Sequence, residues 1–363
     1  MSKVRSFPPV GMQGAGQARS EVENYKNILV VRLDRMGDVV LSTPALKALR
    51  DAYPDSRITF MVRPYVKDIA QGNPSVNEVI IYDKGRGFLE NLEFIRRLRN
   101  KKFDLAVVLH PTFRTNWIVF LSGIPKRLGF DRKRKMGILL TDKIPDMKHL
   151  GLKHEIDYTL DILRYIGVNV KDRKMHVPVN QDSQARSREA LERGGISEND
   201  TVVVINPGAS CPSKRWPAKK FAEAADMLVK SRGVKIVIIS GKEDKGFGEK
   251  VAFSMKESCL DLSGKTTVGD IAGILKRAKL FISNDSGPVH VACAIGTPVV
   301  AIFGRCDRGL SPRRWGPSNN GDVVIHKDVG CLECLAHNCA LGFRCLQAIT
   351  VNEVVKAAEE LLR

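Results

Sequence analysis

Short apolar runs alternate with amphipathic stretches along most of the chain. The apolar runs cover residues 27–32, 57–62, 78–82, 104–109, 201–206, 234–240, 280–283 and 298–303. Helical periodicity in the second half covers residues 217–230, 267–277, 287–295 and 352–362, and similar patterns lie between most of the runs in the first half. Short runs rich in β-branched residues that alternate with helices predict parallel sheets covered by helices, an α/β fold.

The alternation occurs twice, which predicts two domains in the 363 residues. The polar stretch 181–200 reads as a linker with one helix, so the predicted domains are residues 27–180 and 201–363. Residues 1–26 are rich in Gly, Ser and Gln and are predicted to form a disordered arm. Ligands of doubly wound sheets bind outside the carboxyl ends of the strands, so the site is expected in the strand-to-helix loops.

The distribution of charge along the chain indicates what kind of partner the protein binds. The chain carries 58 Lys and Arg against 40 Asp and Glu, and residues 1–180 hold 32 of the basic and 19 of the acidic residues. A basic N-terminal half fits nucleic acid, anionic lipid head groups or an acceptor with phosphates and carboxylates, although it also fits a surface that is merely soluble. No apolar run approaches the about 18 residues of a membrane helix, and the arm lacks a signal peptide's apolar stretch, so a cytoplasmic protein is expected.

The loop after run 27–32 brings a carboxylate, Asp38, close to the start of a helix. Gly37 beside it is expected to permit a tight turn. Asp38 is either a helix cap, a role that Asp takes readily, or a general base that removes the proton of an attacking hydroxyl.

The loop after run 201–206 has the features of a pyrophosphate site. Gly208 and Ala209 leave backbone amides open, Ser210 can donate to a phosphate, and Lys214 adds a positive charge before the next helix. Basic residues before a helix are also common on solvated surfaces.

The loop after run 280–283 contains Asp285, Ser286 and Gly287 ahead of Pro288, which suits a first helical turn. The free amides of that turn can bind an anion. Asp285 can accept hydrogen bonds from sugar hydroxyls or cap the helix, and His290 is expected to be a packed histidine.

Two familiar nucleotide motifs are not matched. Residues 264–266 look like the end of a phosphate loop, but Cys259 stands where that motif requires its first glycine. No Rossmann glycine fingerprint follows a predicted strand. A nucleoside triphosphatase or a dehydrogenase is therefore disfavoured.

Taken in order, these loops resemble glycosyltransferase family 9, the ADP-heptose to lipopolysaccharide heptosyltransferases. The resemblance runs from Asn27 to nearly the C-terminus. It is carried by Met36, Gly37, Asp38, Thr43 and Pro44, by residues 214–217, 283–292, 296–298 and 303–304, and by Arg127, Gly129, Phe130, His154, Glu155 and Tyr158. It implies a GT-B fold, two doubly wound Rossmann-like domains facing a central cleft, with the acceptor in the N-terminal and the nucleotide sugar in the C-terminal domain.

By this resemblance, Asp38 is the general base of an inverting transfer that requires no metal ion or other cofactor. The donor, an ADP-sugar, is assigned to Ser210, Lys214, Glu243, Asp285, Ser286 and Gly287, with Lys214 at the phosphate and Glu243 near the ribose. Pro288 has no amide, so one backbone contact available in some relatives is missing.

The acceptor implied by the resemblance is an anionic glycolipid at the inner membrane surface, which gives the basic N-terminal half a reason. Basic residues that follow or flank strand ends are the expected acceptor contacts: Arg63, Lys67, Arg114 and Arg127. The expected location is cytoplasmic, peripherally associated with the inner face of the cytoplasmic membrane. A nucleic-acid partner is not expected, since neither stacking platforms nor a recognition motif is found.

Four cysteines gather near the C-terminus: Cys331, Cys334, Cys339 and Cys345. Their spacing admits a structural zinc site, although the paired knuckles of common zinc ribbons are missing. Reduced packed thiols and, in last place for a reducing cytoplasm, disulfides are the other interpretations.

Three functions stay open at this point. The first is a heptosyltransferase-like enzyme. The second is a GT-B relative with another nucleotide sugar or acceptor, or a non-hydrolysing nucleotide-sugar epimerase. An epimerase has no acceptor surface and would leave the N-terminal charge unexplained. The third, a basic nucleic-acid-binding protein, lacks the expected motifs.

Overall fold

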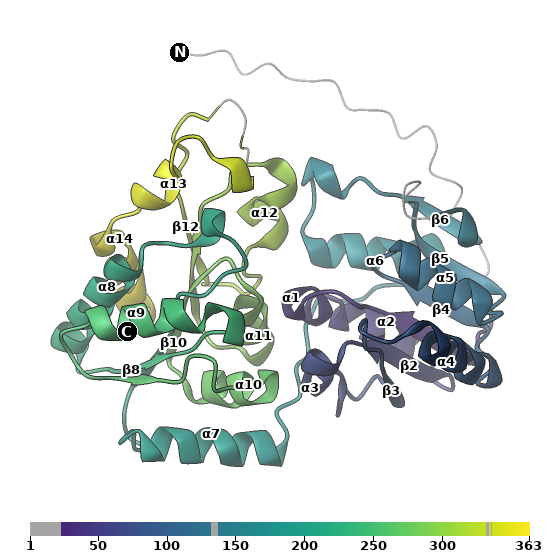
Figure 1. The fold of residues 1–363 in the computed structure, drawn as a ribbon, viewed down its shortest axis with the longest axis horizontal. Coiled ribbons are helices and arrows are strands. Elements are labelled where there is room, and N and C mark those ends of the chain that lie inside the picture. The colour runs from purple at the N-terminus through teal and green to yellow at the C-terminus, as the bar shows by residue number, and fades with distance from the viewer. Residues whose placement is uncertain (1–22, 132–136, 332–333, 335) are drawn as a thin grey trace.

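Two parallel sheets organise the protein in the computed structural model, which describes residues 23–131, 137–331, 334 and 336–363 (Figure 1). Each sheet has six strands, and their orders are β3-β2-β1-β4-β5-β6 and β12-β11-β10-β7-β8-β9. Counted from its own first strand, each sheet thus has the doubly wound order 3-2-1-4-5-6. The strand order reverses between β1 and β4 and between β7 and β10, which are the switch points where ligands of such sheets bind.

The N-terminal lobe is built on the first sheet. Its strands are β1 (Asn27–Val31), β2 (Arg57–Val62), β3 (Glu78–Ile81), β4 (Leu105–Val108), β5 (Lys126–Asp131) and β6 (Asp142–Pro145). Its helices are α1 (Met36–Val40), α2 (Thr43–Ala52), η1 (Pro64–Val66), α3 (Lys67–Ala70), α4 (Phe88–Asn100), α5 (Phe113–Leu121), η3 (Gly137–Leu139), η4 (Lys148–Leu150) and α6 (Glu155–Tyr165).

The C-terminal lobe is built on the second sheet. Its strands are β7 (Val202–Asn206), β8 (Lys235–Ile238), β9 (Cys259–Asp261), β10 (Leu280–Asn284), β11 (Val299–Phe303) and β12 (Val323–His326). Its helices are α7 (Gln181–Arg193), η5 (Pro212–Lys214), α8 (Ala218–Arg232), η6 (Lys242–Asp244), α9 (Lys245–Ser254), α10 (Val268–Arg277), α11 (Gly287–Ile295), η7 (Arg308–Leu310), α12 (Pro312–Trp315), η8 (Ala336–Asn338), α13 (Arg344–Gln347) and α14 (Val351–Leu361).

Both faces of the first sheet are buried. Ile28 and Val30 of β1 pack into one cluster with α1, α2 and α6, whereas Leu29 and Val31 pack into another with α4 and α5. Burial on both faces explains why the central strands read as continuous apolar runs rather than as alternating ones. In the part of the chain that the structure describes, no helix has both the length and the apolarity needed to cross a membrane.

The predicted α/β class and GT-B architecture are confirmed, and all eight predicted strands are present within one or two residues at their ends. Strands β5, β6, β9 and β12 were not predicted. Helix α7 lies where a linker with one helix is predicted, and it packs on α10, with Ser187 Oγ donating to the Asp270 carbonyl oxygen at 2.9 Å. The domain boundaries themselves stay a prediction. Residues 1–22 of the predicted arm and the basic run 132–135 lie outside the described residues.

The two lobes meet along the carboxyl ends of their sheets, where α1 packs against α11 (Figure 1). Gly37 and Gly287 make this approach close. A Cβ atom on Gly37 would lie 2.8 Å from Cδ2 of His290, and one on Gly287 would lie 3.1 Å from the backbone nitrogen of Gly37. Gly37 is helical and does not have a positive φ, so the expectation that it permits a tight turn is wrong. Its lack of a side chain serves the contact between lobes.

Candidate active site

A buried arginine organises the carboxyl end of β1. Arg32 follows the strand and is 1% exposed. Its Nη2 donates to Oδ1 of Asp38 at 2.8 Å, its Nε donates to Oδ1 of Asp34 at 2.8 Å, and its Nη1 donates to the Leu109 carbonyl oxygen at 3.2 Å. Leu109 follows β4, so one guanidinium joins the two loops of the first switch point.

Asp38 is oriented by this arginine and does not act as the helix cap. The N-cap of α1 is Arg35, and Asp38 is the third helical residue. The Asp38 carboxylate is partly exposed and is bound by Arg32, while its backbone carbonyl oxygen accepts a hydrogen bond from Ser42 Oγ at 2.7 Å. A carboxylate held this way at a switch point can accept a proton from a bound ligand.

Asp34 shares Arg32 with Asp38 but is a different kind of carboxylate. Burial raises the pKa of Asp34 to about 7; the charge of Arg32 opposes this rise and that of Asp38 adds to it. Its other oxygen lies 3.4 Å from Nδ1 of His110, and its backbone carbonyl oxygen accepts a hydrogen bond from the Tyr65 hydroxyl at 3.3 Å. Asp34 was not among the predicted site residues.

Glu155, the first residue of α6, connects this cluster to the other lobe. It is 1% exposed, accepts from Lys148 Nζ at 2.5 Å, and lies 3.5 Å from Arg32 Nη2. Arg314 of α12 donates to its second oxygen from Nε at 3.0 Å and from Nη2 at 2.8 Å. Burial alone would raise the pKa of Glu155, but the three cations outweigh it and hold that pKa at about 2.

Neutral side chains organise the second switch point, between β7 and β10. Nδ2 of Asn206 donates to Ser283 Oγ at 3.1 Å and to Ser286 Oγ at 2.8 Å. The side chain of Asn284 accepts from the Trp216 amide at 3.0 Å and donates to the Pro207 carbonyl oxygen at 2.7 Å. These bonds fix the loop after β7 against the start of α11.

The predicted donor residues lie at this second switch point. Lys214 Nζ pairs with Asp285 Oδ2 at 2.8 Å. Ser286 is the N-cap of α11 and Gly287 its first residue, but the Ser286 hydroxyl makes no capping bond to the helix. The structure therefore brings Lys214, Asp285, Ser286 and Gly287 together.

Two further predicted donor residues lie nearby. Ser210 accepts a hydrogen bond from Arg35 Nη1 at 3.0 Å, across the boundary between the lobes. Glu243 is exposed in η6, and its neighbour Asp244 pairs with Arg215 at 2.6 Å, while Arg215 Nε donates to the Ala209 carbonyl oxygen at 2.9 Å. Arg215 thus ties η6 to the loop after β7.

His290 is packed, as expected, yet its Nδ1 has no hydrogen-bond partner among the described residues. It lies on α11 against Gly37. Burial, followed by the nearby His154 and Lys214, lowers the pKa of His290 to about 3, so the ring is neutral. A neutral ring lets α1 and α11 approach without a further buried charge.

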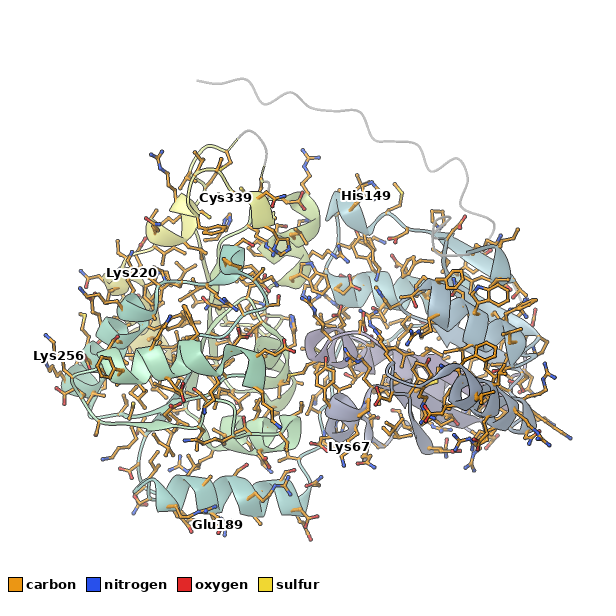
Figure 2. All side chains as sticks on the ribbon, in the orientation of Figure 1. Lys67, His149, Glu189, Lys220, Lys256 and Cys339 are labelled. Carbon is orange, nitrogen blue, oxygen red and sulfur yellow. The ribbon has the colours of Figure 1, made fainter. Side chains whose placement is uncertain are left out.

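Three of the four predicted acceptor residues lie beyond the carboxyl ends of strands of the first sheet, and one does not. Arg63 follows β2 and stacks over the Tyr65 ring at 5.0 Å, and exposed Lys67 begins α3, beside the contact of Asp68 with the Gly269 amide (Figure 2). Arg114, in the first turn of α5, donates to the Lys84 carbonyl oxygen at 2.5 Å.

Arg127 lies near the amino end of its strand, at the opposite end of the strands from the site. It lies near the start of β5, in register with Ala106. Its guanidinium donates to the carbonyl oxygens of Leu139 at 2.7 Å and Ile124 at 2.5 Å. Its contacts are those of a structural residue, and it lies far along the strand from the switch point.

The C-terminal cysteines are free thiols in one region, near Cys339 in Figure 2. Burial raises the pKa of Cys345, and the charges of Cys334, Cys339 and Cys331 add to the rise. Cys306 joins them, since burial and a hydrogen bond with Cys334 raise its pKa to about 12. Over the described stretches of the chain, no three His, Cys, Asp or Glu side chains are arranged to hold a metal ion. The zinc site stays a prediction.

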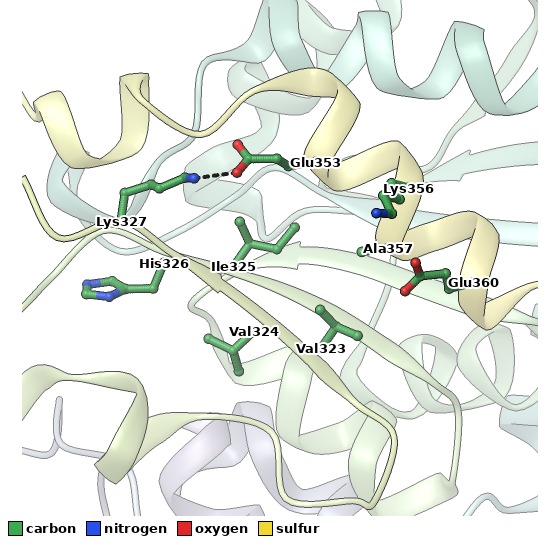
Figure 3. A pocket seen from close by; sticks show the side chains of 9 residues that line it. All are labelled: Val323, Val324, Ile325, His326, Lys327, Glu353, Lys356, Ala357 and Glu360. Carbon is green, nitrogen blue, oxygen red and sulfur yellow. Dashed lines mark hydrogen bonds and ion pairs between the residues drawn. The ribbon is translucent and has the colours of Figure 1, made fainter.

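A hollow of about 350 Å³ lies between β12 and α14, away from both switch points (Figure 3). Val323, Ile325 and Ala357 line it, and an ion pair between Lys327 and Glu353 borders it. It contains none of the predicted donor or acceptor residues, so we do not assign the active site there.

Arg32, Asp34 and the pairing of Glu155 with Arg314 were missed as site features. Arg32 could have been identified from its position, because it is a charged residue directly after an apolar strand. The partners of Glu155 carry no local signal, because Arg314 is 159 residues away in the sequence.

Comparisons with known proteins agree with this arrangement. The family model for glycosyltransferase family 9 (heptosyltransferase) matches residues 91–343. Lipopolysaccharide heptosyltransferase 2 of Escherichia coli K12 is 27% identical over 346 residues, which cover 92% of this chain and 98% of that protein. A lipopolysaccharide heptosyltransferase 3 of Escherichia coli is 29% identical over 297 residues, covering 79% of this chain and 85% of that protein.

Solved structures share the fold. The family 9 glycosyltransferase from Veillonella parvula superposes with a TM-score of 0.84 at 28% identity, covering 95% of this chain and 99% of that one. The ADP-heptose heptosyltransferase II of Escherichia coli superposes with a TM-score of 0.75 at 24% identity, covering 93% and 98%. With two doubly wound lobes that meet at their switch points and a family match over most of its length, the chain belongs to glycosyltransferase family 9 and is a glycosyltransferase.

Proposed function

We propose that the protein transfers heptose from ADP-heptose to a hydroxyl of the lipopolysaccharide core, with inversion at the anomeric carbon and without a metal ion. The names of the relatives supply the sugar and the acceptor. The observation that carries the mechanism is the Arg32-bound carboxylate of Asp38 in the helix that abuts α11 of the opposite lobe.

The donor lies on the second switch point. Lys214 and the first amides of α11 face the pyrophosphate, because a lysine and a helix N-terminus both favour an anion. Asp285 holds Lys214 at 2.8 Å and so positions the cation for the phosphate. Asp285 then accepts hydrogen bonds from sugar hydroxyls, and exposed Glu243 is at the ribose.

The transfer is a single displacement. The acceptor oxygen attacks the anomeric carbon as its proton passes to Asp38, and the bond from that carbon to the β-phosphate oxygen breaks with its electron pair on ADP. Arg32 fixes Asp38 through Oδ1, so Oδ2 is the oxygen that takes the proton. Lys214 and the α11 amides stabilise the charge that develops on the leaving phosphate, which is the task of a metal ion in other transferases.

The acceptor is an anionic glycolipid, and the N-terminal lobe takes it. Arg63, Lys67 and Arg114 lie after or beside the carboxyl ends of the first sheet and are suited to phosphates and sugar carboxylates. With a lipid-anchored acceptor, we expect the enzyme in the cytoplasm, peripherally associated with the inner face of the cytoplasmic membrane.

The test is a transfer assay with ADP-heptose and a heptose-deficient core acceptor, with ADP release and product mass as readouts. Turnover is expected to be the same with and without a chelator. A requirement for added magnesium or manganese would contradict the metal-free mechanism. Conversion of a nucleotide sugar without any acceptor would instead identify an epimerase, and binding of only non-adenine nucleotide sugars would identify another donor.

A further inference from the structure

One face of the N-terminal lobe exposes large apolar side chains on three neighbouring elements. Phe88 and Leu89 of α4 are each 77% exposed, Phe113 of α5 is 56% exposed, and Ile138 of η3 is 76% exposed. Leu92 and Phe120 on the same two helices are exposed as well. Single exposed apolar residues are ordinary, but a group of them on adjacent elements marks an interaction surface.

The two helices lie side by side, so this is one surface, which we call the α4–α5 face. Arg114 at the start of α5 donates to the Lys84 carbonyl oxygen just before α4, and Arg99 near the end of α4 donates to the Leu121 carbonyl oxygen at the end of α5 at 2.7 Å. Trp117 stands between Phe113 and Phe120, with ring centroids 6.0 and 6.1 Å apart. An aromatic row therefore runs along α5.

The α4–α5 face is also basic. Helices α4 and α5 and residues 83–87 just before α4 hold six Lys and Arg against three Asp and Glu. Two of the acidic residues already have partners, since Glu90 accepts from the Gly87 amide at 3.0 Å and Glu93 lies 4.0 Å from Arg97. Exposed apolar residues and cations on the same elements suit an acidic bilayer, which has an apolar interior and anionic head groups.

We propose that the α4–α5 face docks the protein on a bilayer that contains anionic lipids. This inference rests on the proposed function, in which the acceptor is anchored in a membrane. Phe88 and Phe113 lie at the helix ends nearest the carboxyl edge of the first sheet, next to Arg114. A bilayer on this face would therefore present an anchored sugar at the edge of the sheet that carries Asp38.

A second copy of the chain is the competing occupant of this face. A symmetric pairing would bring the same patch of both copies together, and so would oppose the two sets of arginines. Like charges held together in an interface disfavour it, whereas anionic head groups neutralise them. The charge of the face thus favours the bilayer.

Sedimentation of the full-length protein with vesicles tests the proposal. The parent is expected to bind vesicles of phosphatidylcholine with phosphatidylglycerol at least about tenfold more tightly than vesicles of phosphatidylcholine alone, because each basic residue near an anionic surface adds about fivefold. The double variant Phe88→Ser/Leu89→Ser is expected to weaken binding by about tenfold or more, since two apolar side chains no longer enter the lipid boundary. The matched control, Phe253→Ser on α9 of the other lobe, removes a side chain that is 92% exposed and is expected to bind like the parent.

The proposal is overturned if the double variant binds like the parent, if Phe253→Ser weakens binding equally, or if the parent does not prefer anionic vesicles. A lipid-free dimer that becomes monomeric in the double variant would assign the face to a second copy and overturn it too. Transfer to an acceptor stripped of its lipid is expected to be unchanged in the double variant. A protein that docks as expected but transfers no sugar would overturn the proposed function alone, and the reverse result would overturn the docking surface alone.

Discussion

The two switch points hold their loops by different kinds of interaction. At the first, charged side chains do so: Arg32 binds Asp34 and Asp38, and Glu155 binds Lys148 and Arg314. At the second, neutral hydrogen bonds from Asn206 and Asn284 hold the loops, and two ion pairs, Lys214 with Asp285 and Arg215 with Asp244, are added to them.

This difference indicates which side can adapt to a ligand. Buried charges must stay paired, because an uncompensated one is strongly destabilising. The first switch point is thus rigid and suits a carboxylate whose position matters. At the second, the loops stay fixed by neutral bonds, so Lys214 can exchange Asp285 for a phosphate if sugar hydroxyls take its place on the buried Asp285.

The largest expected effect is on stability, from Glu155→Gln. The amide leaves Lys148 and Arg314 without their buried anion, whereas Arg32 keeps Asp34 and Asp38, so the free energy of unfolding in urea is expected to fall by about 3–5 kcal/mol. Asp161→Asn on the same helix is the matched control, since Asp161 pairs with exposed Lys153 and Arg164 and is expected to contribute at most about 1 kcal/mol. Equal losses in the two variants would mean that the buried cluster does not hold the lobes together.

The next effect is on turnover, from Asp38→Asn. The amide fits the same space beside Arg32 but cannot take the acceptor proton, so turnover is expected to fall by about 100-fold or more with donor affinity nearly unchanged. The measurement is kcat at saturating donor and acceptor, with donor binding measured separately. Turnover within a few-fold of the parent would remove Asp38 from the mechanism.

A pH effect separates Asp34 from its neighbour. Burial raises the pKa of Asp34 to about 7, above its usual value of 3.8. Between these two values the folded protein binds a proton that the unfolded chain has lost, so the contribution of Asp34 to stability is full below about pH 4 and is lost as pH rises to about 7. Asp34→Asn is therefore expected to gain stability relative to the parent as pH rises from 5 to 7, by about 1 kcal/mol per pH unit. Parallel pH profiles of unfolding for the two proteins would contradict this.

The sequence was sufficient for the central strands and for the edge strand β3, and insufficient for β5 and for the edge strands β6, β9 and β12. Val202–Asn206 and Val299–Phe303 are buried on both faces and read as apolar runs, which made them predictable. The edge and near-edge strands Lys126–Asp131, Asp142–Pro145 and Cys259–Asp261 are short and contain charged residues, so they lack this pattern. Their pairing depends on neighbours that only the folded chain supplies.

The candidate site likewise contains residues that the sequence predicted and contacts that it could not predict. Asp38, Lys214 and Asp285 lie in the segments that follow apolar strands, and the topology of doubly wound sheets predicts that such segments meet. The pairing of Glu155 with Arg314 joins the two lobes and follows no local spacing. Arg127 was misplaced because a residue beside a strand can belong to either end of it, and only the register with β4 shows which.

The smallest expected effect is at the second switch point, from Lys214→Ala. The variant removes one cation from the proposed phosphate site but leaves the neutral network of Asn206 and Asn284, so the fold is expected to persist. The dissociation constant of ADP or ADP-heptose is expected to rise by about tenfold, which corresponds to the loss of one charge-assisted hydrogen bond. Lys219→Ala, which changes an exposed lysine in the first turn of α8, is the matched control and is expected to leave donor binding unchanged.

Calorimetric titration of both variants is the measurement. Equal affinities for Lys214→Ala and Lys219→Ala would show that the phosphates are not bound at this loop. A tenfold loss confined to Lys214→Ala, with kcat restored at saturating donor, would instead show that Lys214 acts mainly in binding the donor, whereas a fall in kcat would show that it also stabilises the leaving phosphate.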